Sequence, residues 1–146
     1  MEYIRQATQA DLGRIAEIIV FNYRLQFYPI FRCDDYYFRE LQVVDLAEKY
    51  HAFLGNMWVY DDGAVKGVVH VEGREVKKLF VEPVLQGRGI GSALLVYAVD
   101  RCGARELWAL EKNVRAIAFY VRHGFAVTAD RKPEEDTQEY LVRLER

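Results

Sequence analysis

The sequence is poor in cysteine and proline and has no long apolar segment. Its two cysteines, Cys33 and Cys102, form no CxxC pair and are too few for a disulfide framework. This usage indicates reduced thiols and a cytoplasmic protein. The longest apolar run is far shorter than a membrane span, and the first 15 residues lack the apolar core of a secretory signal. The composition therefore predicts no membrane partner.

The sequence also lacks an excess of charge of either sign. Lysine and arginine together number 20 against 22 aspartates and glutamates, so the net charge of −2 predicts no nucleic-acid partner. The three histidines, His51, His70 and His123, have no metal-ligand spacing with one another or with cysteine, and no metal site is expected. About half of the 146 residues are apolar, which predicts a single domain over residues 1–146 with one sizeable core.

The segment over residues 76–101, VKKLFVEPVLQGRGIGSALLVYAVDR, has the strongest functional pattern. An apolar strand runs into a Glu-Pro corner, a glycine-rich turn and then a helical pattern. Glycines let the backbone approach a ligand closely, and the free N–H groups at a helix start bind anions, so this segment predicts a phosphate site. A dinucleotide fingerprint would need glycine in place of Ser92, and a Walker A loop would need Gly-Lys-Ser/Thr. The remaining pattern is Gln86-x-x-Gly89-x-Gly91.

Periodicity and turn signals predict an α/β (α+β) fold. Helices are expected from Thr8, with Asp11 as a weak capping-box acid, to before Pro29, then over residues 34–46, 90–103 and 113–124. Strands are expected over residues 2–6, 57–60, 65–71, 75–81, 106–110, 125–128 and 137–144, with a polar loop over 129–136. The three strands between residues 57 and 81 should form an antiparallel meander. The strand over 106–110 follows a helix and should pair in parallel. A mixed, mostly antiparallel sheet flanked by helices results.

Residues 24–40 are dense in aromatic side chains, interrupted by Asp34 and Asp35. Two interpretations remain open. The rings close the core over one end of the sheet, or they form a lip at a substrate site, where the two aspartates attract a cationic, partly apolar substrate.

Two motifs together resemble the GNAT superfamily of N-acetyltransferases. The turn over residues 86–91, QGRGIG, matches the family pattern Gln/Arg-x-x-Gly-x-Gly/Ala, and residues 113–125, NVRAIAFYVRHGF, resemble the later Asn-x-x-Ala-x-x-Phe-Tyr…Gly-Phe motif. The order of elements fits as well. The resemblance implies the family's mixed sheet, acetyl-CoA as co-substrate and no metal.

The resemblance also implies the residues that contact coenzyme A. Backbone N–H groups of the turn would bind the pyrophosphate, and the strand before it would pair with the pantetheine arm, which Asn113 contacts. Arg88 would add a charged contact, or else be a solvated side chain; Asn113 also serves as the helix cap. The cofactor-binding residues expected are Leu79, Phe80, Val81, Gln86, Gly87, Arg88, Gly89, Ile90, Gly91, Ser92, Asn113, Ala116 and Phe119.

Catalytic roles follow from the same resemblance. Tyr120 would protonate the departing thiolate, although a tyrosine beside a phenylalanine is otherwise typical of a core. Glu75 would deprotonate the amine; a surface role for Glu75, His70 as the base and a water chain to solvent remain open alternatives. The Val81 N–H would stabilise the developing oxyanion.

The sequence thus predicts an acetyl-CoA-dependent N-acetyltransferase that acts by direct transfer to a primary amine of an unidentified small molecule or protein. Neither cysteine lies in the motifs, which agrees with direct transfer. The alternatives are a non-catalytic acyl-CoA-binding sensor on the same fold and a nucleotide-binding module of another class. The family also makes a homodimer a reasonable expectation.

Overall fold

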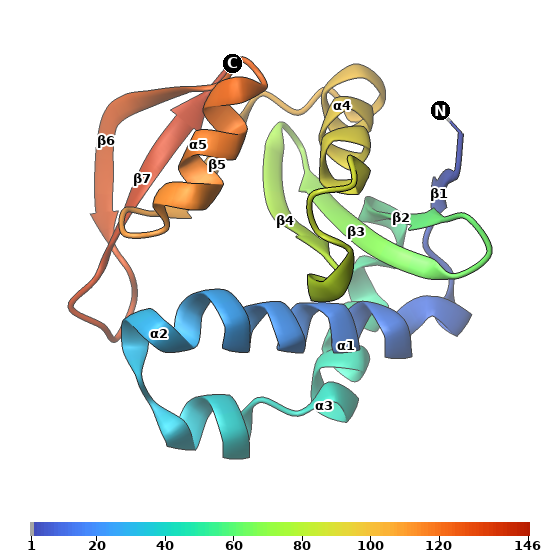
Figure 1. Cartoon of the computed structure of the whole chain (residues 1–146), viewed down its shortest axis with the longest axis horizontal. Coiled ribbons are helices and arrows are strands. Elements are labelled where there is room, and N and C mark those ends of the chain that lie inside the picture. The colour runs from blue at the N-terminus through green and yellow to red at the C-terminus, as the bar shows by residue number, and fades with distance from the viewer. Residues whose placement is uncertain (1) are drawn as a thin grey trace.

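The computed structural model describes residues 2–146, and Met1, where the expected domain begins, lies outside them. A seven-stranded sheet has the order β1-β2-β3-β4-β5-β7-β6 (Figure 1). Its strands are β1 (Ile4–Gln6), β2 (Met57–Asp61), β3 (Val65–Glu72), β4 (Glu75–Val81), β5 (Glu106–Leu110), β6 (Ala126–Pro133) and β7 (Tyr140–Glu145). All neighbouring pairs are antiparallel except β4 and β5, which confirms the predicted sheet.

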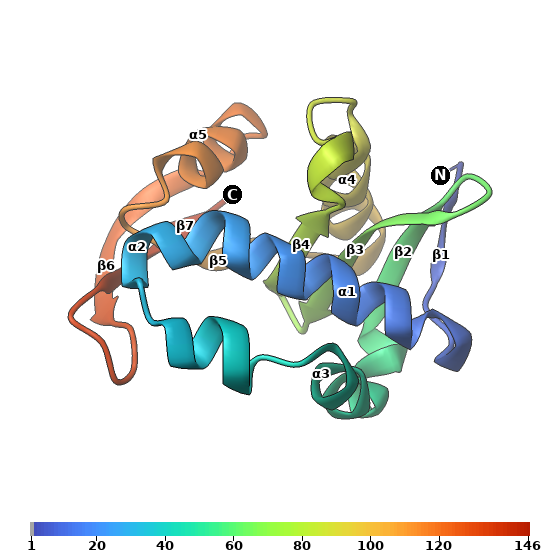
Figure 2. The same ribbon diagram turned by 60° about the horizontal axis from the view of Figure 1, so that its bottom comes forward.

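Helices cover both faces of this sheet. They are α1 (Leu12–Asn22), α2 (Tyr28–Phe31), α3 (Val43–Tyr50), α4 (Ile90–Cys102) and α5 (Val114–Arg122). Side chains alternate along β3, so Val68 packs in the cluster under α1 and α3, whereas Val69 packs in the cluster under α4. Figure 2 shows α1 and α3 together, with α4 and α5 standing away from them. No helix within residues 2–146 is long and apolar enough to cross a membrane.

Close packing of α4 on β3 places the glycine turn at the end of β4. A Cβ added to Gly67 of β3 would lie 2.8 Å from Leu94 Cδ1 and 3.1 Å from Ile90 Cγ2, so glycine at this position lets α4 approach the strand closely. The start of α4 is thereby held beside the last residues of β4.

The first helix extends further than predicted. We expected it to stop before Pro29, but helical backbone continues through a π-helical stretch, Tyr23–Phe27, into α2 and ends at Arg32 in the left-handed conformation. The Tyr28 N–H donates to the Tyr23 carbonyl, five residues back. Pro29 then lies in the first turn of α2, where a missing N–H is tolerated. The wide turn before it therefore accommodates the proline.

Other boundaries also differ from the prediction, and the last strand begins at Tyr140 instead of residue 137. The expected helix over residues 34–46 is interrupted at Leu41, whose backbone is extended, between a π-helical stretch, Tyr36–Glu40, and α3. The polar loop expected over residues 129–136 is wrong for residues 129–133, which belong to β6. Residues 131–133 instead continue β6 and pair with β7, after a register irregularity that follows Val127. Polar residues form this strand because β6 lies at the edge of the sheet, where most of its side chains are exposed.

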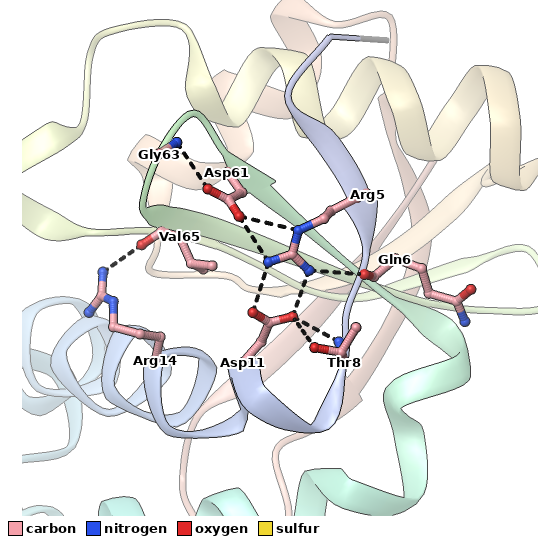
Figure 3. A network of polar contacts seen from close by, with 8 residues as sticks. All are labelled: Arg5, Gln6, Thr8, Asp11, Arg14, Asp61, Gly63 and Val65. Atoms are coloured by element: carbon pink, nitrogen blue, oxygen red, sulfur yellow. Dashed lines mark hydrogen bonds and ion pairs between the residues drawn. The ribbon is translucent and has the colours of Figure 1, made fainter.

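A charged network holds the start of α1 to the sheet (Figure 3). The Arg5 guanidinium donates to both Asp11 carboxylate oxygens, at 2.7 and 2.9 Å, and to Asp61 at 2.9 Å. The buried Asp11 carboxylate also accepts from the Thr8 N–H at 2.8 Å, as the predicted capping box requires. These hydrogen bonds from Arg5 hold the pKa of the Asp11 carboxyl below its ordinary value of 3.8.

Candidate functional site

The sheet opens between its two parallel strands. β4 and β5 pair only at Glu75–Glu106 and Val76–Leu107, near their amino-terminal ends. Beyond these two pairs the strands separate, so the carboxyl half of β4 lacks a neighbour on the β5 side. This register therefore leaves a gap between the carboxyl ends of β4 and β5.

Backbone polar groups of β4 face the opening. The Glu82 N–H donates to the Lys66 carbonyl at 2.9 Å, and ladder hydrogen bonds in an antiparallel pair alternate along the strand. Leu79 and Val81 therefore direct their N–H and C=O groups away from β3, toward the gap. The Val81 carbonyl is bound by the Asn22 side chain at 2.8 Å. The N–H groups of Leu79 and Val81 remain oriented toward the gap as donors.

The glycine turn adds further donors. Gly87 and Gly89 have positive φ of 82° and 84°, and a Cβ at either would strain the backbone, although each has open space around it. Gly89 is the N-cap of α4, which has no side-chain cap, and the first intrahelical bond of this end runs from the Ala93 N–H to the Gly89 carbonyl. The first N–H groups of the helix are thus available to an anion.

A cavity of about 530 Å³ lies between the turn, β4 and α5. Of the predicted cofactor-binding residues, all but Arg88 line it. Those residues are Leu79, Phe80, Val81, Gln86, Gly87, Gly89, Ile90, Gly91, Ser92, Asn113, Ala116 and Phe119. The Arg88 side chain is exposed and outside the lining, which favours the alternative of a solvated residue.

Sequence reasoning missed five residues of this lining: Leu25, Gln26, Leu85, Arg115 and Arg122. Arg115 and Arg122 are seven residues apart on α5, a spacing that puts both on one helical face, and this signal could have identified them. Leu25 and Gln26 belong to the π-helical stretch after α1. Their position depends on where that stretch crosses the sheet, which no local pattern indicates.

Ser92 is held by a histidine that the sequence did not assign to the site. The His123 ring donates from Nδ1 to the Phe119 carbonyl at 2.8 Å, so its Nε2 accepts from the Ser92 hydroxyl at 3.0 Å. The Ser92 side chain is therefore engaged with α5, and the backbone N–H of Ser92 is the group left for a ligand.

Tyr120 lines the cavity together with Phe119, its neighbour on α5. Its ring packs against Phe119 and Phe125, with centroids 5.3 and 5.9 Å away. Its hydroxyl makes no hydrogen bond to any residue from 2 to 146. Burial raises the pKa of the Tyr120 phenol well above its ordinary value of 10, so the group carries its proton at neutral pH. A protonated, unengaged phenol at this position can donate to a ligand.

A second cavity of about 320 Å³ opens on the other side of Tyr120. Six residues line both cavities, namely Gln26, Leu79, Phe80, Asn113, Ala116 and Tyr120. The second cavity is more strongly charged, because Glu75, Lys77, Lys78, Lys132 and Glu134 contribute to it. The two cavities thus meet at the gap between β4 and β5.

The two candidate bases lie in different places. Glu75 lines the second cavity, as Tyr120 does, and its carboxylate pairs with Lys77 at 3.3 Å. His70 lines neither cavity. It is 5% exposed on β3, binds Glu72 at 2.9 Å and packs against Phe53. The geometry therefore favours Glu75 over His70.

The aromatic segment is core only in part, because Tyr37 is buried whereas Tyr36 and Phe38 are 40% and 51% exposed. Tyr28, Tyr36, Tyr37 and Phe38 pack on one another, and Tyr28 donates to Asp34 at 2.5 Å. Asp35 pairs with Arg39. Only Phe27 of residues 27–38 reaches the second cavity, so neither aspartate forms the predicted cation-attracting lip. No group of three or more metal-ligating side chains occurs among residues 2–146.

Known proteins share both motifs and fold. The family described as acetyltransferase (GNAT) domain matches residues 54–127. Peptidyl-lysine N-acetyltransferase YiaC of Escherichia coli is 38% identical over 91 residues, covering 60% of this chain and 62% of that protein. Peptidyl-lysine N-acetyltransferase YjaB of Salmonella typhimurium is 31% identical over 74 residues, covering 49% of this chain and 51% of that protein. The chain thus aligns with less than two thirds of these relatives.

Solved structures agree along nearly the whole chain. The apo form of YjaB from Escherichia coli superposes with a TM-score of 0.71 at 22% identity, covering 97% of this chain and 95% of that one. PaiA N-acetyltransferase from Thermoplasma acidophilum, solved in complex with coenzyme A, superposes with a TM-score of 0.70 at 18% identity, covering 98% of both. With the family match extending over half its length, this chain belongs to the GNAT acetyltransferase family.

Proposed function

We propose that this chain is an N-acetyltransferase that binds acetyl-CoA in the first cavity and transfers its acetyl group to an amine that enters the second. One observation carries the proposal: Tyr120, a phenol with a raised pKa and an unengaged hydroxyl, lies in the wall that the two cavities share. An acid is needed at that place only if a leaving group departs there.

The residues present fit coenzyme A. Left-handed glycines with open space around them and the uncapped start of α4 suit a pyrophosphate. Arg115 and Arg122 lie in the same lining and can pair with further phosphate oxygens. The Leu79 and Val81 N–H groups face the gap, where an amide-containing pantetheine arm can pair with β4 as a neighbouring strand would. One solved structure of similar fold, that of yncA from Salmonella typhimurium, contains its cofactor acetyl-CoA.

The chain's residues divide the transfer between them. The amine nitrogen bonds to the acyl carbon while the carbon–sulfur bond breaks. The Val81 N–H donates to the oxygen on which negative charge develops. Tyr120 gives its proton to the departing sulfur. Glu75, or water connected to it, takes the proton of the amine, because an ammonium has no lone pair with which to attack.

The acceptor proposed is a primary amine. A peptidyl lysine is favoured, because the similar proteins YiaC of Escherichia coli and YjaB of Salmonella typhimurium are peptidyl-lysine N-acetyltransferases. Glu134 also lines the second cavity and forms no ion pair with a residue in 2–146, so it can pair with an ammonium there, in competition with Lys77, Lys78 and Lys132 of the same lining. A small-molecule amine uses the same chemistry and remains the second candidate.

Free-thiol release from acetyl-CoA with lysine peptides and small amines tests this proposal. We expect turnover with at least one amine class, and Tyr120→Phe should lower kcat by about 10²–10⁴-fold with coenzyme A affinity unchanged. Tyr97→Phe is the matched control, since Tyr97 of α4 packs on Trp58 and lines neither cavity.

Three results would contradict parts of the proposal. An unchanged kcat in Tyr120→Phe would remove its role as the acid. Stabilisation by acetyl-CoA without turnover of any amine would favour the non-catalytic sensor. An unfolding midpoint that acetyl-CoA leaves unshifted, whereas another nucleotide raises it, would favour a different nucleotide-binding class.

A further inference from the structure

A buried asparagine lies at the open end of the gap and uses its full hydrogen-bonding capacity. Asn22, the last residue of α1, is 0% exposed. Its amide nitrogen donates to the Ile18 and Val81 carbonyls, both at 2.8 Å. Its oxygen accepts from Gln26 at 2.8 Å and from Gln86 at 3.0 Å. A carboxamide offers two donors and can accept twice, so all four of its possible bonds are made.

Gln26 continues this network to the far side of the gap. While its nitrogen donates to Asn22, its oxygen accepts from the Asn113 side chain at 3.3 Å. Asn113 follows β5 and caps α5, since its own oxygen accepts from the Ala116 N–H at 3.3 Å. Three consecutive hydrogen bonds, which we call the amide bridge, therefore run from the Val81 carbonyl through Asn22 and Gln26 to Asn113.

The amide bridge lies where strand pairing fails. Two parallel strands are ordinarily joined by backbone hydrogen bonds along their length, but β4 and β5 lose theirs after Val76 and Leu107. At the opposite, open end, the side chains of α1 and of the π-helical stretch join the same two strands. π-helical turns are often found at functional sites, and this one places Gln26 in the lining of both cavities.

We propose that Gln26 is a positioning residue for the cofactor arm, a role that rests on the proposed function. The amide bridge sets the separation of β4 and β5 at their open end. It also fixes the orientation of the Asn113 carboxamide, because Ala116 engages its oxygen and Gln26 engages one of its two N–H donors. The second N–H donor of Asn113 is left for the pantetheine arm. A fully bonded network of this kind is rigid, so the arm meets a donor that is already oriented.

The role predicts that Gln26 affects one half of coenzyme A only. The adenosine bisphosphate half would bind at the glycine turn. This turn is connected to Asn22 through Gln86, and Gln26 is not part of that connection. The pantetheine half would bind at Asn113. A change at Gln26 should therefore weaken the binding of coenzyme A and leave that of adenosine 3′,5′-bisphosphate, which has no pantetheine arm, unaltered.

Calorimetric titration of Gln26→Met with both ligands tests this inference, because methionine keeps the length and helix compatibility of glutamine and removes its hydrogen bonds. We expect a coenzyme A Kd about 5- to 10-fold higher, the factor for one lost hydrogen bond, and a bisphosphate Kd within about twofold of wild type. Gln42→Met is the matched control, since Gln42 is exposed and bonds only the Arg39 carbonyl; both affinities should stay at wild-type values.

Equal weakening of both ligands in Gln26→Met, or no change in either, would overturn the positioning role. A second variant, Gln26→Glu, keeps an oxygen for Asn113 but places a carboxylate against the Asn22 oxygen, and it should lower coenzyme A affinity with the same selectivity. If wild type binds neither ligand, the proposed function itself fails, so the two failures are distinguishable.

Discussion

The two ends of α1 are attached to the sheet by different chemistry. At its start, the charged network of Arg5, Asp11 and Asp61 connects β1, α1 and the β2–β3 hairpin. At its end, the amide bridge connects α1 to β4 and α5 with uncharged groups only. The charged network lies away from both cavities and can titrate. The amide bridge borders the gap where a thioester would lie, and it changes neither charge nor geometry with pH. The proposed acetyl transfer moves protons between an amine and a thiolate, and supports that carry no charge of their own would leave the pKa values of those groups unperturbed.

The largest expected effect comes from placing a charge in the uncharged end. Asn22→Asp cannot donate to the Ile18 and Val81 carbonyls and buries a carboxylate beside them. We expect the free energy of unfolding to fall by about 3 kcal/mol or more at pH 7, measured by urea denaturation. Burial would raise the pKa of the new carboxyl, so the loss should shrink as pH falls and the group becomes neutral. The exposed Gln42 gives the control, Gln42→Glu, which should cost less than about 1 kcal/mol because this side chain bonds only the Arg39 carbonyl.

A smaller effect is expected from neutralising the charged end. The pKa of Asp11 is depressed in the folded chain, so the unfolded chain takes up this proton at higher pH. The stability that Asp11 contributes is therefore present above about pH 4 and is lost as pH falls through the folded-state pKa. Asp11→Asn should lower the free energy of unfolding by about 1–2 kcal/mol at pH 7 and by much less near pH 2, measured by denaturation across this range. A loss that is the same at both pH values would show that the carboxylate charge is unimportant.

The smallest expected effect is a difference in how the coupling energies at the two ends of α1 respond to salt. Arg5 is half-exposed, and its pair with Asp61 should give a small stabilising coupling energy in a double-mutant cycle at low ionic strength. Raising salt from about 0.1 M to about 1 M shortens the screening length from about 10 Å to about 3 Å and should bring that coupling energy near zero. The coupling between Asn22 and Gln86, measured in the same way, should stay constant. A parallel decrease in both would contradict the assignment of one end as electrostatic and the other as not.

Local chemistry made much of the first cavity's lining predictable. Gly89 needs a left-handed backbone and Asn113 caps a helix through its own side chain, so a short sequence window contains the cause of each structure. Hairpin turns likewise indicated the meander from β2 to β4. Arg88 shows the limit, because its direction depends on the three-dimensional course of the turn.

Distant contacts account for what the sequence did not predict. Pro29 reads as a helix stop, but a π-helical turn accommodates it. Residues 131–133 read as loop, but pairing with β7 makes them strand. Asn22 and Gln26 read as ordinary polar positions four residues apart on a helix. Their importance comes from Val81 and Asn113, which are 59 and 87 residues away in the chain.

The short ladder between β4 and β5 also bears on how this fold opens. With backbone bonding confined to two residue pairs, the sheet consists of a four-stranded unit, β1 to β4, and a three-stranded unit, β5 to β7, in which β7 lies between its two neighbours. Local unfolding follows such units, so we expect amide hydrogens of the two to exchange with solvent at different free energies of opening. A ligand lying along the gap would bond to both units. Their free energies of opening should then become similar, because the two units would unfold together.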